Sequence, residues 1–278
     1  NTLTGQLEQN VTRYVTVDDP AGQALGAKAL KPEKSMNYSV GFVATPTSNL
    51  DITVDLYQID INNRILQTSN LQGPAVSNLL ASKGLDPNQI VSYFGNLADT
   101  RTRGIDLVAD YRYDFGQYGK VKWTLLSNQS LQTVRKVKEP AALAGTGVTA
   151  VGRDKIGNLT SAYPKNVTSL NTAWQLGDFD VNLKETHYTG VTGLNQVSPT
   201  RDEKIDPAFI TDLSVGYWLS DAVKLTVGGE NIFTRRPQQL NDEAKKYYFA
   251  PTDNPTHSWY SPYGLDGAYY FAKVDVSW

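Results

Sequence analysis

The sequence predicts an all-β fold, an antiparallel transmembrane β-barrel, on three observations. Segments of about ten residues alternate between apolar and polar side chains, the pattern of a strand with one face in lipid and the other in water. The connections between these segments are alternately short and long. The chain also ends, from Tyr269 to Trp278, on a strand that alternates throughout and finishes on an aromatic residue.

The terminal strand carries the clearest alternation. Apolar side chains fall on one face and mostly polar ones on the other, and the apolar set is Tyr270, Ala272, Val274, Val276 and Trp278. Because outer-membrane barrels end in this way, we expect Tyr270 and Trp278 to serve barrel insertion and closure.

The composition excludes two broad classes of protein. The 278 residues include 26 basic and 28 acidic ones, a net charge of −2, so there is no basic field for a nucleic-acid partner. The sequence also lacks the roughly 18 consecutive apolar residues that a transmembrane helix needs. Cysteine is absent, which suits an oxidising and a reducing compartment equally. The chain begins at Asn1 without a signal peptide, so we expect a mature piece or a fragment.

Nine strands are expected from the period-two pattern. Their ranges are 34–44, 50–66, 101–114, 119–131, 165–175, 178–188, 208–218, 223–233 and 269–278. In the second strand the phase slips near Gln58, where Ile59 and Ile61 take over the opposite parity. A β-bulge or an exit of the strand from the membrane would produce this slip.

The connections fix the orientation of these strands. The short ones are tight turns rich in Gly, Pro, Asn, Asp and Ser, whereas 67–100, 134–164, 189–207 and 234–268 exceed the usual loop length of a compact domain. Outer-membrane barrels have short periplasmic turns and long extracellular loops. We therefore expect residues 1–33 to belong to an extracellular loop and 34–278 to form the C-terminal part of a barrel. An odd number of strands would leave unpaired edges in lipid, so missing N-terminal strands are expected to complete it.

Short helices are expected within two of the long loops. In the first, residues 77–83 end at Gly84, and a second helix is expected from Asp86-Pro87 to Gly95. In the last loop, acids precede bases from Asp242 to Lys246, as the helix dipole prefers.

Five local patterns resemble one family, the TonB-dependent outer-membrane receptors. The first is Leu30-Lys31-Pro32-Glu33-Lys34-Ser35, followed by Tyr38 and Gly41-Phe42. The others, in order along the chain, are Val54-Asp55-Leu56-Tyr57-Gln58-Ile59, Thr102-Arg103-Gly104-Ile105-Asp106, Gly229-Glu230-Asn231-Ile232-Phe233 and the ending from Gly267-Ala268-Tyr269-Tyr270 to Trp278. The resemblance covers residues 30–278.

The resemblance implies the last nine strands of a barrel of about 22 strands in the bacterial outer membrane. It implies active transport of a scarce or bulky nutrient, namely a siderophore, an oligosaccharide or an aromatic compound, energised by TonB through an N-terminal plug that this sequence does not include. The partners it implies are outer-membrane lipid and lipopolysaccharide, the missing plug and strands, and the barrel-assembly machinery. No enzymatic activity and no cofactor are expected.

The aromatic residues of the last long loop are the substrate-binding candidates. They are Tyr247, Tyr248, Trp259, Tyr260 and Tyr263, with Phe249 and His257 beside them. Aromatic rings give a large contact area for a ring-bearing ligand, although they could equally pack the loop on itself or lie at the headgroup level.

The charged residues allow two interpretations. The pairs Arg235-Arg236 and Lys245-Lys246 could bind an anion or the phosphates of lipopolysaccharide, or simply be solvated. Aspartates on the polar strand faces could line a transport path. Alternatively, they could simply make the lumen hydrophilic and pair with Lys122, Lys273 or Arg112. These aspartates are Asp51, Asp55, Asp106, Asp110 and Asp275. The two histidines, His187 and His257, lie apart with no carboxylate cluster, so we expect no metal site.

Two other functions are compatible with a barrel. A passive porin or an adhesin-like barrel fits the loop and turn pattern equally well. A hydrolase would need an Asp/His or Ser/His pair at the rim, and only His187 and His257 could supply it.

Overall fold

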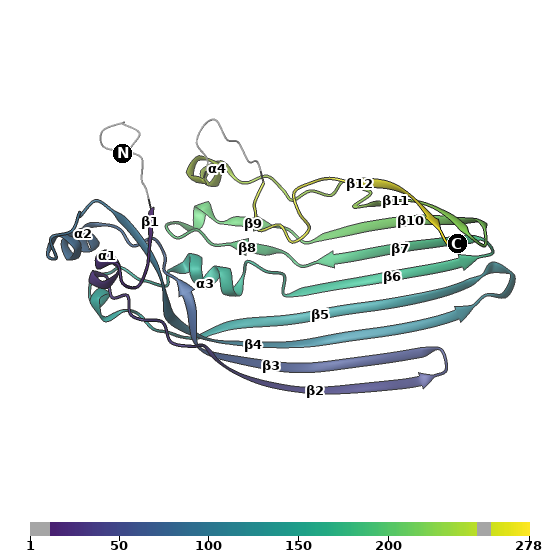
Figure 1. Cartoon of the computed structure of the whole chain (residues 1–278), viewed down its shortest axis with the longest axis horizontal. Coiled ribbons are helices and arrows are strands. Elements are labelled where there is room, and N and C mark those ends of the chain that lie inside the picture. The colour runs from purple at the N-terminus through teal and green to yellow at the C-terminus, as the bar shows by residue number, and fades with distance from the viewer. Residues whose placement is uncertain (1–11, 249–256) are drawn as a thin grey trace.

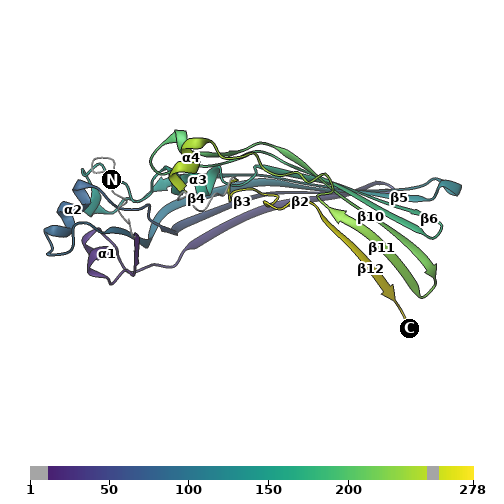
Figure 2. The same ribbon diagram turned by 90° about the horizontal axis from the view of Figure 1, so that it is seen from above.

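A computed structural model describes residues 12–248 and 257–278 and consists mainly of one curved antiparallel sheet (Figure 1). Its strands follow the chain order except that β7 pairs with β10, giving β12-β11-β10-β7-β6-β5-β4-β3-β2. Figure 2 shows β11 and β12 turning away from the plane of the other strands. These nine strands match the number expected from the sequence.

The bounds of these strands reproduce most of the predicted ranges. They are β2 Lys34–Thr47, β3 Leu50–Gln67, β4 Ile90–Asp114, β5 Lys120–Val137, β6 Asn166–Leu176, β7 Phe179–Tyr188, β10 Ala208–Ser220, β11 Val223–Glu230 and β12 Tyr269–Val276. Three short strands lie outside this path: β1 (Thr12–Val15) pairs in parallel with β4, and β8 (Val191–Gly193) pairs with β9 (Glu203–Ile205).

The other elements that the described residues form are four short helices, α1 Pro20–Ala24, α2 Pro74–Ala81, α3 Arg153–Thr160 and α4 Asp242–Tyr248, and three 3-10 turns, Gly116–Tyr118, Ala141–Leu143 and Pro199–Arg201. No helix in the described ranges has the length and apolarity to cross a membrane.

One predicted helix is wrong. The segment from Asp86-Pro87 to Gly95 is not a second helix, because β4 already begins at Ile90. The apolar and aromatic residues there favour strand, and β4 extends beside β3 and the parallel β1 to a length of 25 residues. The helices expected at 77–83 and 242–246 are present as α2 and α4, with α2 starting three residues earlier at Pro74.

Short turns and long loops lie at opposite ends of the sheet, as Figure 1 shows. We call these the turn end and the loop end. The turns join β2 to β3, β4 to β5, β6 to β7 and β10 to β11, and the C-terminal residues also lie at the turn end (Figure 1). All four helices and the β8–β9 hairpin lie at the loop end.

The strand register gives the sheet one apolar and one polar face. A row across the apolar face reads Ala44, Ile52, Ala109, Leu125 and Leu170. The neighbouring row, on the polar face, reads Asp51, Asp110, Thr124, Asn171, Lys184 and Asp212. Because a membrane barrel puts apolar side chains towards lipid, the polar face is the lumen side.

Aromatic rings mark the turn end of the apolar face. Tyr111 stacks on Trp123 with ring centroids 5.8 Å apart, and Tyr113 meets Phe115 edge-on at 4.6 Å. Amphipathic rings are enriched at the level of the membrane interface. This group therefore marks the level at which the apolar face meets a membrane interface at the turn end.

The phase slip near Gln58 is an exit from the apolar band. The pairing of β3 with β4 runs unbroken from Leu50 to Ile61, and the irregularity comes only after it, near Asn63, whose φ is +56°. Gln58 and Asp60 thus stay on the face that carries Val54 and Leu56, whereas Ile59 and Ile61 lie on the opposite face.

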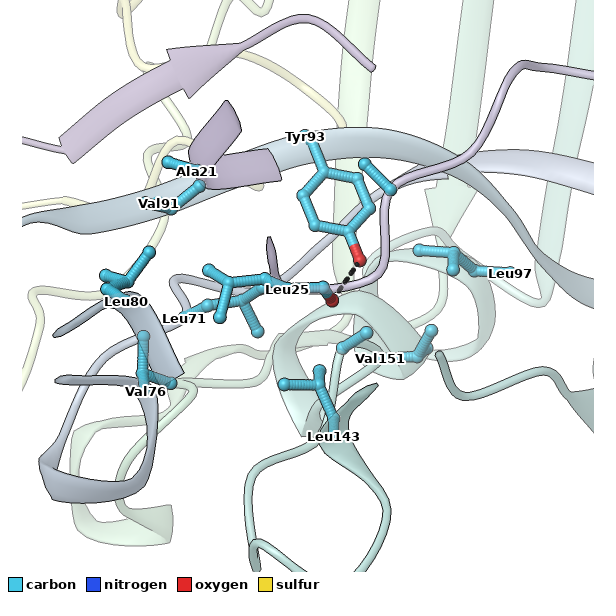
Figure 3. Close-up of a cluster of buried hydrophobic side chains, with 12 residues drawn as sticks. Ala21, Leu25, Leu71, Val76, Leu80, Val91, Tyr93, Leu97, Leu143 and Val151 are labelled. Atoms are coloured by element: carbon cyan, nitrogen blue, oxygen red, sulfur yellow. Dashed lines mark hydrogen bonds between the residues drawn. The ribbon is translucent and has the colours of Figure 1, made fainter. Parts of the chain in front are cut away.

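The buried apolar core lies at the loop end, where the connections pack against the first residues of β4 (Figure 3). One cluster holds side chains that are almost fully buried: Leu25 between α1 and β2, Leu71 before α2, Leu80 in α2 and Tyr93 in β4. The Tyr93 hydroxyl donates to the Leu25 carbonyl at 3.0 Å, and burial raises the pKa of Tyr93. The long loops thereby form a packed cap.

Candidate functional site

Three of the long loops are tied together by polar contacts. The Ser69 hydroxyl after β3 donates to Asp154 of α3 at 2.6 Å and accepts the amide of Gly152 at 3.0 Å. Next to it, Asn70 exchanges two hydrogen bonds with the side chain of Gln196, at 3.2 and 2.9 Å. The loop surface is therefore one structure with fixed relative positions.

An ion pair anchors the β8–β9 hairpin to α3. Arg153 donates to both carboxylate oxygens of Asp202, at 2.6 and 2.9 Å, and the amide of Asn195 donates to Asp202 at 2.8 Å. The Arg153 guanidinium, followed by the Asn195 amide, holds the pKa of Asp202 below its usual range despite burial. Such bidentate pairs are among the stronger polar contacts in proteins.

The next residue, Glu203, is a buried acid. It is 5% exposed, and burial raises the pKa of its carboxyl, against which a hydrogen bond with Ser258 acts. Its Oε2 atom has no hydrogen-bond partner within the described residues. Ser258 is itself fully buried, so this contact joins the last long loop to the hairpin.

Tyr260 completes the contact between the last loop and its neighbours. Its hydroxyl donates to Asn158 of α3 at 2.9 Å. Its ring covers Gly193 so closely that a Cβ atom there would lie 2.2 Å from a ring carbon, which leaves room only for glycine. Burial raises the pKa of the Tyr260 hydroxyl.

The aromatic candidates therefore occupy different places. Trp259 is 72% exposed, whereas Tyr260 is packed and Tyr263 lies with its ring 5.9 Å from that of Tyr188. The Tyr263 hydroxyl is buried with no partner in the described ranges. Tyr247 and Tyr248 are the last residues of α4, and their side chains lie outside the described residues, as does Phe249.

The charged pairs at the loop end lie in different surroundings. The backbone of Arg235 is held by the Asn231 side chain, which bonds both its amide and its carbonyl. Lys245 and Lys246 pair with acids one turn earlier on α4, at 4.0 and 3.6 Å. These lysines thus form ordinary helix-surface pairs of small energetic value.

On the polar face, most of the predicted acids have cationic or amide partners. Arg112 donates to Asp51 at 2.8 Å, Lys122 lies 3.2 Å from Asp110, and Lys273 lies 2.6 Å from Asp275. Asp106 accepts from Asn128 at 2.5 Å. The charged lumen surface is therefore largely self-paired.

The two histidines have different neighbours. His187 on β7 lies with its ring 4.6 Å from Phe209, and His257 pairs with Gln239 through a backbone bridge. Within residues 12–248 and 257–278, no three His, Cys, Asp or Glu side chains come together as metal ligands would.

Of the two candidates at the C-terminus, Tyr270 lies on β12, which ends at Val276, and Trp278 follows the strand two residues later. The Tyr270 hydroxyl donates to the Ile232 carbonyl at 3.1 Å, and Trp278 projects freely at the turn end. β12 pairs with β11 on one side, and β2 pairs with β3 at the opposite edge of the sheet.

Sequence reasoning missed the residues that assemble the loops. Glu203, Asp202 and Arg153 look like ordinary polar loop residues, and no periodicity reveals which of them become buried. A weak signal was available in the acid pair Asp202-Glu203 flanked by Thr, Arg and Lys within a loop too long to be a simple turn.

Comparison with known proteins identifies the family. The family model described as "TonB dependent receptor-like, beta-barrel" matches residues 3–232, which is most of the chain. The chain belongs to this family of TonB-dependent receptors. It therefore lies in the outer membrane of Gram-negative bacteria, and the loop end is the extracellular side.

Solved structures show the same fold at low sequence identity. The ferric enterobactin receptor PfeA of Pseudomonas aeruginosa, as a G324V mutant, has a TM-score of 0.57 at 16% identity, covering 90% of this chain and 32% of its own. The outer-membrane transporter YddB of Escherichia coli has a TM-score of 0.58 at 10% identity, covering 89% and 33%. The copper transporter OprC has a TM-score of 0.55 at 15% identity, covering 90% and 32%. No curated protein matches the sequence.

This chain spans about a third of the length of those structures. The family consists of transporters, not enzymes, and this leaves the hydrolase interpretation without support.

Proposed function

We propose that this chain is the C-terminal wall and part of the extracellular surface of a transporter that imports a scarce or bulky nutrient, energised through TonB. The observation that carries the proposal is the family match over residues 3–232, because that family is defined by TonB dependence. The polar lumen face and the packed loop cap support it, since both suit a barrel that handles one class of ligand.

For the substrate, we propose a ring-bearing compound: a siderophore, an oligosaccharide or an aromatic molecule. Among the candidates whose side chains the structure describes, Trp259 is the most exposed, and it stands on a loop segment that Tyr260 and Ser258 hold in place. A ring fixed in this way can stack on a ligand at little entropic cost. Two of the similar structures are a ferric enterobactin receptor and a ferric-catecholate import receptor, which agrees with the siderophore class.

The experiment measures uptake by the full-length receptor that carries this chain, expressed in a Gram-negative host deleted for its own siderophore receptors. Ferric catecholates, oligosaccharides and aromatic compounds are offered in parallel arms. We expect saturable uptake of one class that stops with a proton uncoupler and in a host without TonB. Uptake that continues under both conditions would instead favour the passive porin.

Trp259→Ala tests the proposed stacking. We expect an apparent affinity up to about tenfold weaker, since stacked aromatic pairs contribute roughly 0.5–1.5 kcal/mol. Tyr118→Ala is the matched control, because Tyr118 is 68% exposed but lies at the turn end. Equal effects of the two substitutions would contradict the assignment of Trp259.

A further inference from the structure

A small cavity lies at the loop end of the polar face, between β4, β5 and the end of α3. Its volume is about 180 Å³, and the strands line it with the polar side chains of Thr102, Ser130 and Gln132. Gln132 lies directly opposite Thr102, and Thr102 shares its face of β4 with Asp106, because the two are an even number of residues apart. The cavity therefore faces the lumen and not the lipid.

The opposite wall of the cavity comes from the end of α3 and the segment that leads into β6. Figure 1 shows α3 at the loop end, where it packs against β5. The residues that this wall contributes are Leu159, Thr160, Tyr163, Pro164 and Lys165. Tyr163 is 71% exposed, so its ring is open to a ligand that enters the cavity.

The backbone that carries Tyr163 is held on both sides. Before it, the Ser161 hydroxyl donates to the Thr192 carbonyl at 2.7 Å, and the Thr192 amide donates to the Ser161 carbonyl at 2.7 Å. After it, the Lys165 carbonyl accepts the amide of Ser130 at 2.8 Å. Because this chain segment is fixed before a ligand arrives, stacking on the Tyr163 ring costs little conformational entropy.

The strand side of the cavity keeps hydrogen-bonding groups available for a ligand. The Thr102 hydroxyl donates to Oε1 of Gln132 at 3.2 Å, and the Nε2 group of Gln132 has no partner within residues 12–248 and 257–278. The Ser130 hydroxyl is likewise unpaired in the part of the chain that the structure describes. An amide group supplies two donors, and a hydroxyl both donates and accepts. Such groups match the adjacent hydroxyls of a sugar ring.

The charge and size of the cavity separate the three proposed ligand classes. Of the described residues that line it, only Lys165 is charged, whereas a ferric catecholate is an anion that calls for several charge-assisted contacts. An aromatic compound would leave the hydroxyl and amide groups unpaired, which is unfavourable. A sugar ring has an apolar face for Tyr163 and hydroxyls for Gln132 and Ser130. Because drug-sized ligands occupy roughly 300–1,000 Å³, this cavity holds one ring of a larger molecule.

We propose that this cavity binds one ring of a neutral oligosaccharide, with the apolar face of the sugar on Tyr163 and its hydroxyls on Gln132 and Ser130. The inference rests on the proposed function of the chain in a transporter, and it selects one of the three ligand classes. It also places a ligand contact on the wall of the lumen, apart from the aromatic residues of the last long loop. Tyr163 and Gln132 are the residues that determine specificity.

The test titrates the purified full-length receptor that carries this chain with maltotriose, cellotriose, xylotriose and mannotriose by calorimetry, and with ferric enterobactin in a separate arm. We expect saturable binding of at least one trisaccharide. Tyr163→Ala should weaken it about three- to tenfold, whereas Tyr163→Phe keeps the ring and should bind like the wild type. Gln132→Met removes the amide at similar side-chain length and should weaken binding about tenfold. Tyr14→Ala is the matched control, because Tyr14 is 72% exposed at the loop end but lies on β1, and it should change nothing.

Heat-modifiable migration in gels shows that each variant has a folded barrel. The inference is overturned if none of the trisaccharides binds, if Tyr163→Ala and Gln132→Met bind them as the wild type does, or if these substitutions weaken only ferric enterobactin. Uptake by cells that express the same variants separates this inference from the proposed function. TonB-dependent import of ferric enterobactin that neither substitution changes, without trisaccharide binding, contradicts the inference alone. Trisaccharide binding through Tyr163 without TonB-dependent uptake of any compound supports the cavity and contradicts the proposed function.

Discussion

Removing the Tyr260 side chain should release the last long loop from its neighbours. The hydroxyl makes one neutral hydrogen bond to Asn158 at 2.9 Å, which contributes about 1 kcal/mol. Tyr260→Phe should therefore weaken the docking by about 1 kcal/mol. Tyr260→Ala also removes the ring from Gly193, and for a half-buried ring this costs about 2 kcal/mol more.

Hydrogen exchange of the purified full-length receptor measures this docking locally. Because about 1.4 kcal/mol is a factor of ten, exchange in residues 257–266 and in the β8–β9 hairpin should rise about fivefold for Tyr260→Phe and about a hundredfold for Tyr260→Ala. Trp259→Ala is the control and should change exchange less than twofold, since its side chain is 72% exposed. If both alanine variants exchange alike, Tyr260 does not hold the loop.

Three further predictions concern burial and close packing. Because burial raises the pKa of Glu203, the folded state binds its proton more tightly than the unfolded state does; the docking of the β8–β9 hairpin should therefore be most stable below about pH 4 and weaken as the pH rises, and Glu203→Gln should flatten this dependence in hydrogen exchange. Leu80→Ala should destabilise the loop cap by about 2–5 kcal/mol, seen as earlier loss of protection in urea, because Leu80 is fully buried. Gly104→Val should reduce folded barrel in heat-modifiability gels, because a Cβ there would lie 2.2 Å from the Tyr57 ring, and Tyr57→Ala should restore it. Unchanged pH dependence, protection or folding, respectively, would contradict each prediction.

The strands could be predicted because a bilayer imposes one rule on all of them. Each residue pair such as Asp51 and Ile52 places one side chain in the wet lumen and the next in lipid, so the period of two is readable in the sequence alone. The placement of short turns at one end of the sheet and long loops at the other could also be predicted, because turn length and turn composition are local properties of the sequence.

The loop cap could not be predicted, because its contacts join segments far apart in the chain. Ser69 meets Asp154 across 85 residues, and Tyr260 meets Asn158 across 102. The strand at Ile90 was mistaken for a helix because Asp86-Pro87 resembles a helix start. Its pairing with β1 and β3 is long-range, and such pairing overrides local propensity.

The candidate site was predicted as a region and not as a set of contacts. Aromatic composition selected the last loop, but the sequence gives no measure of burial that would separate exposed Trp259 from packed Tyr260. The sequence pattern indicates for Arg103 only that it belongs to a strand motif. Its position at the edge of the apolar band emerges from the register of β4 with β3 and β5.

The orientation of the chain across the membrane can be measured directly by thiol labelling, since the sequence has no cysteine of its own. Val197→Cys places a thiol at the loop end, where Val197 is 58% exposed, and Tyr118→Cys places one at the turn end. In intact cells expressing the full-length receptor, a membrane-impermeant maleimide should label the Val197→Cys variant at once and the Tyr118→Cys variant only after the outer membrane is permeabilised. Labelling of the Tyr118→Cys variant in intact cells, with protection of the Val197→Cys variant, would contradict the assignment of the loop end to the extracellular side.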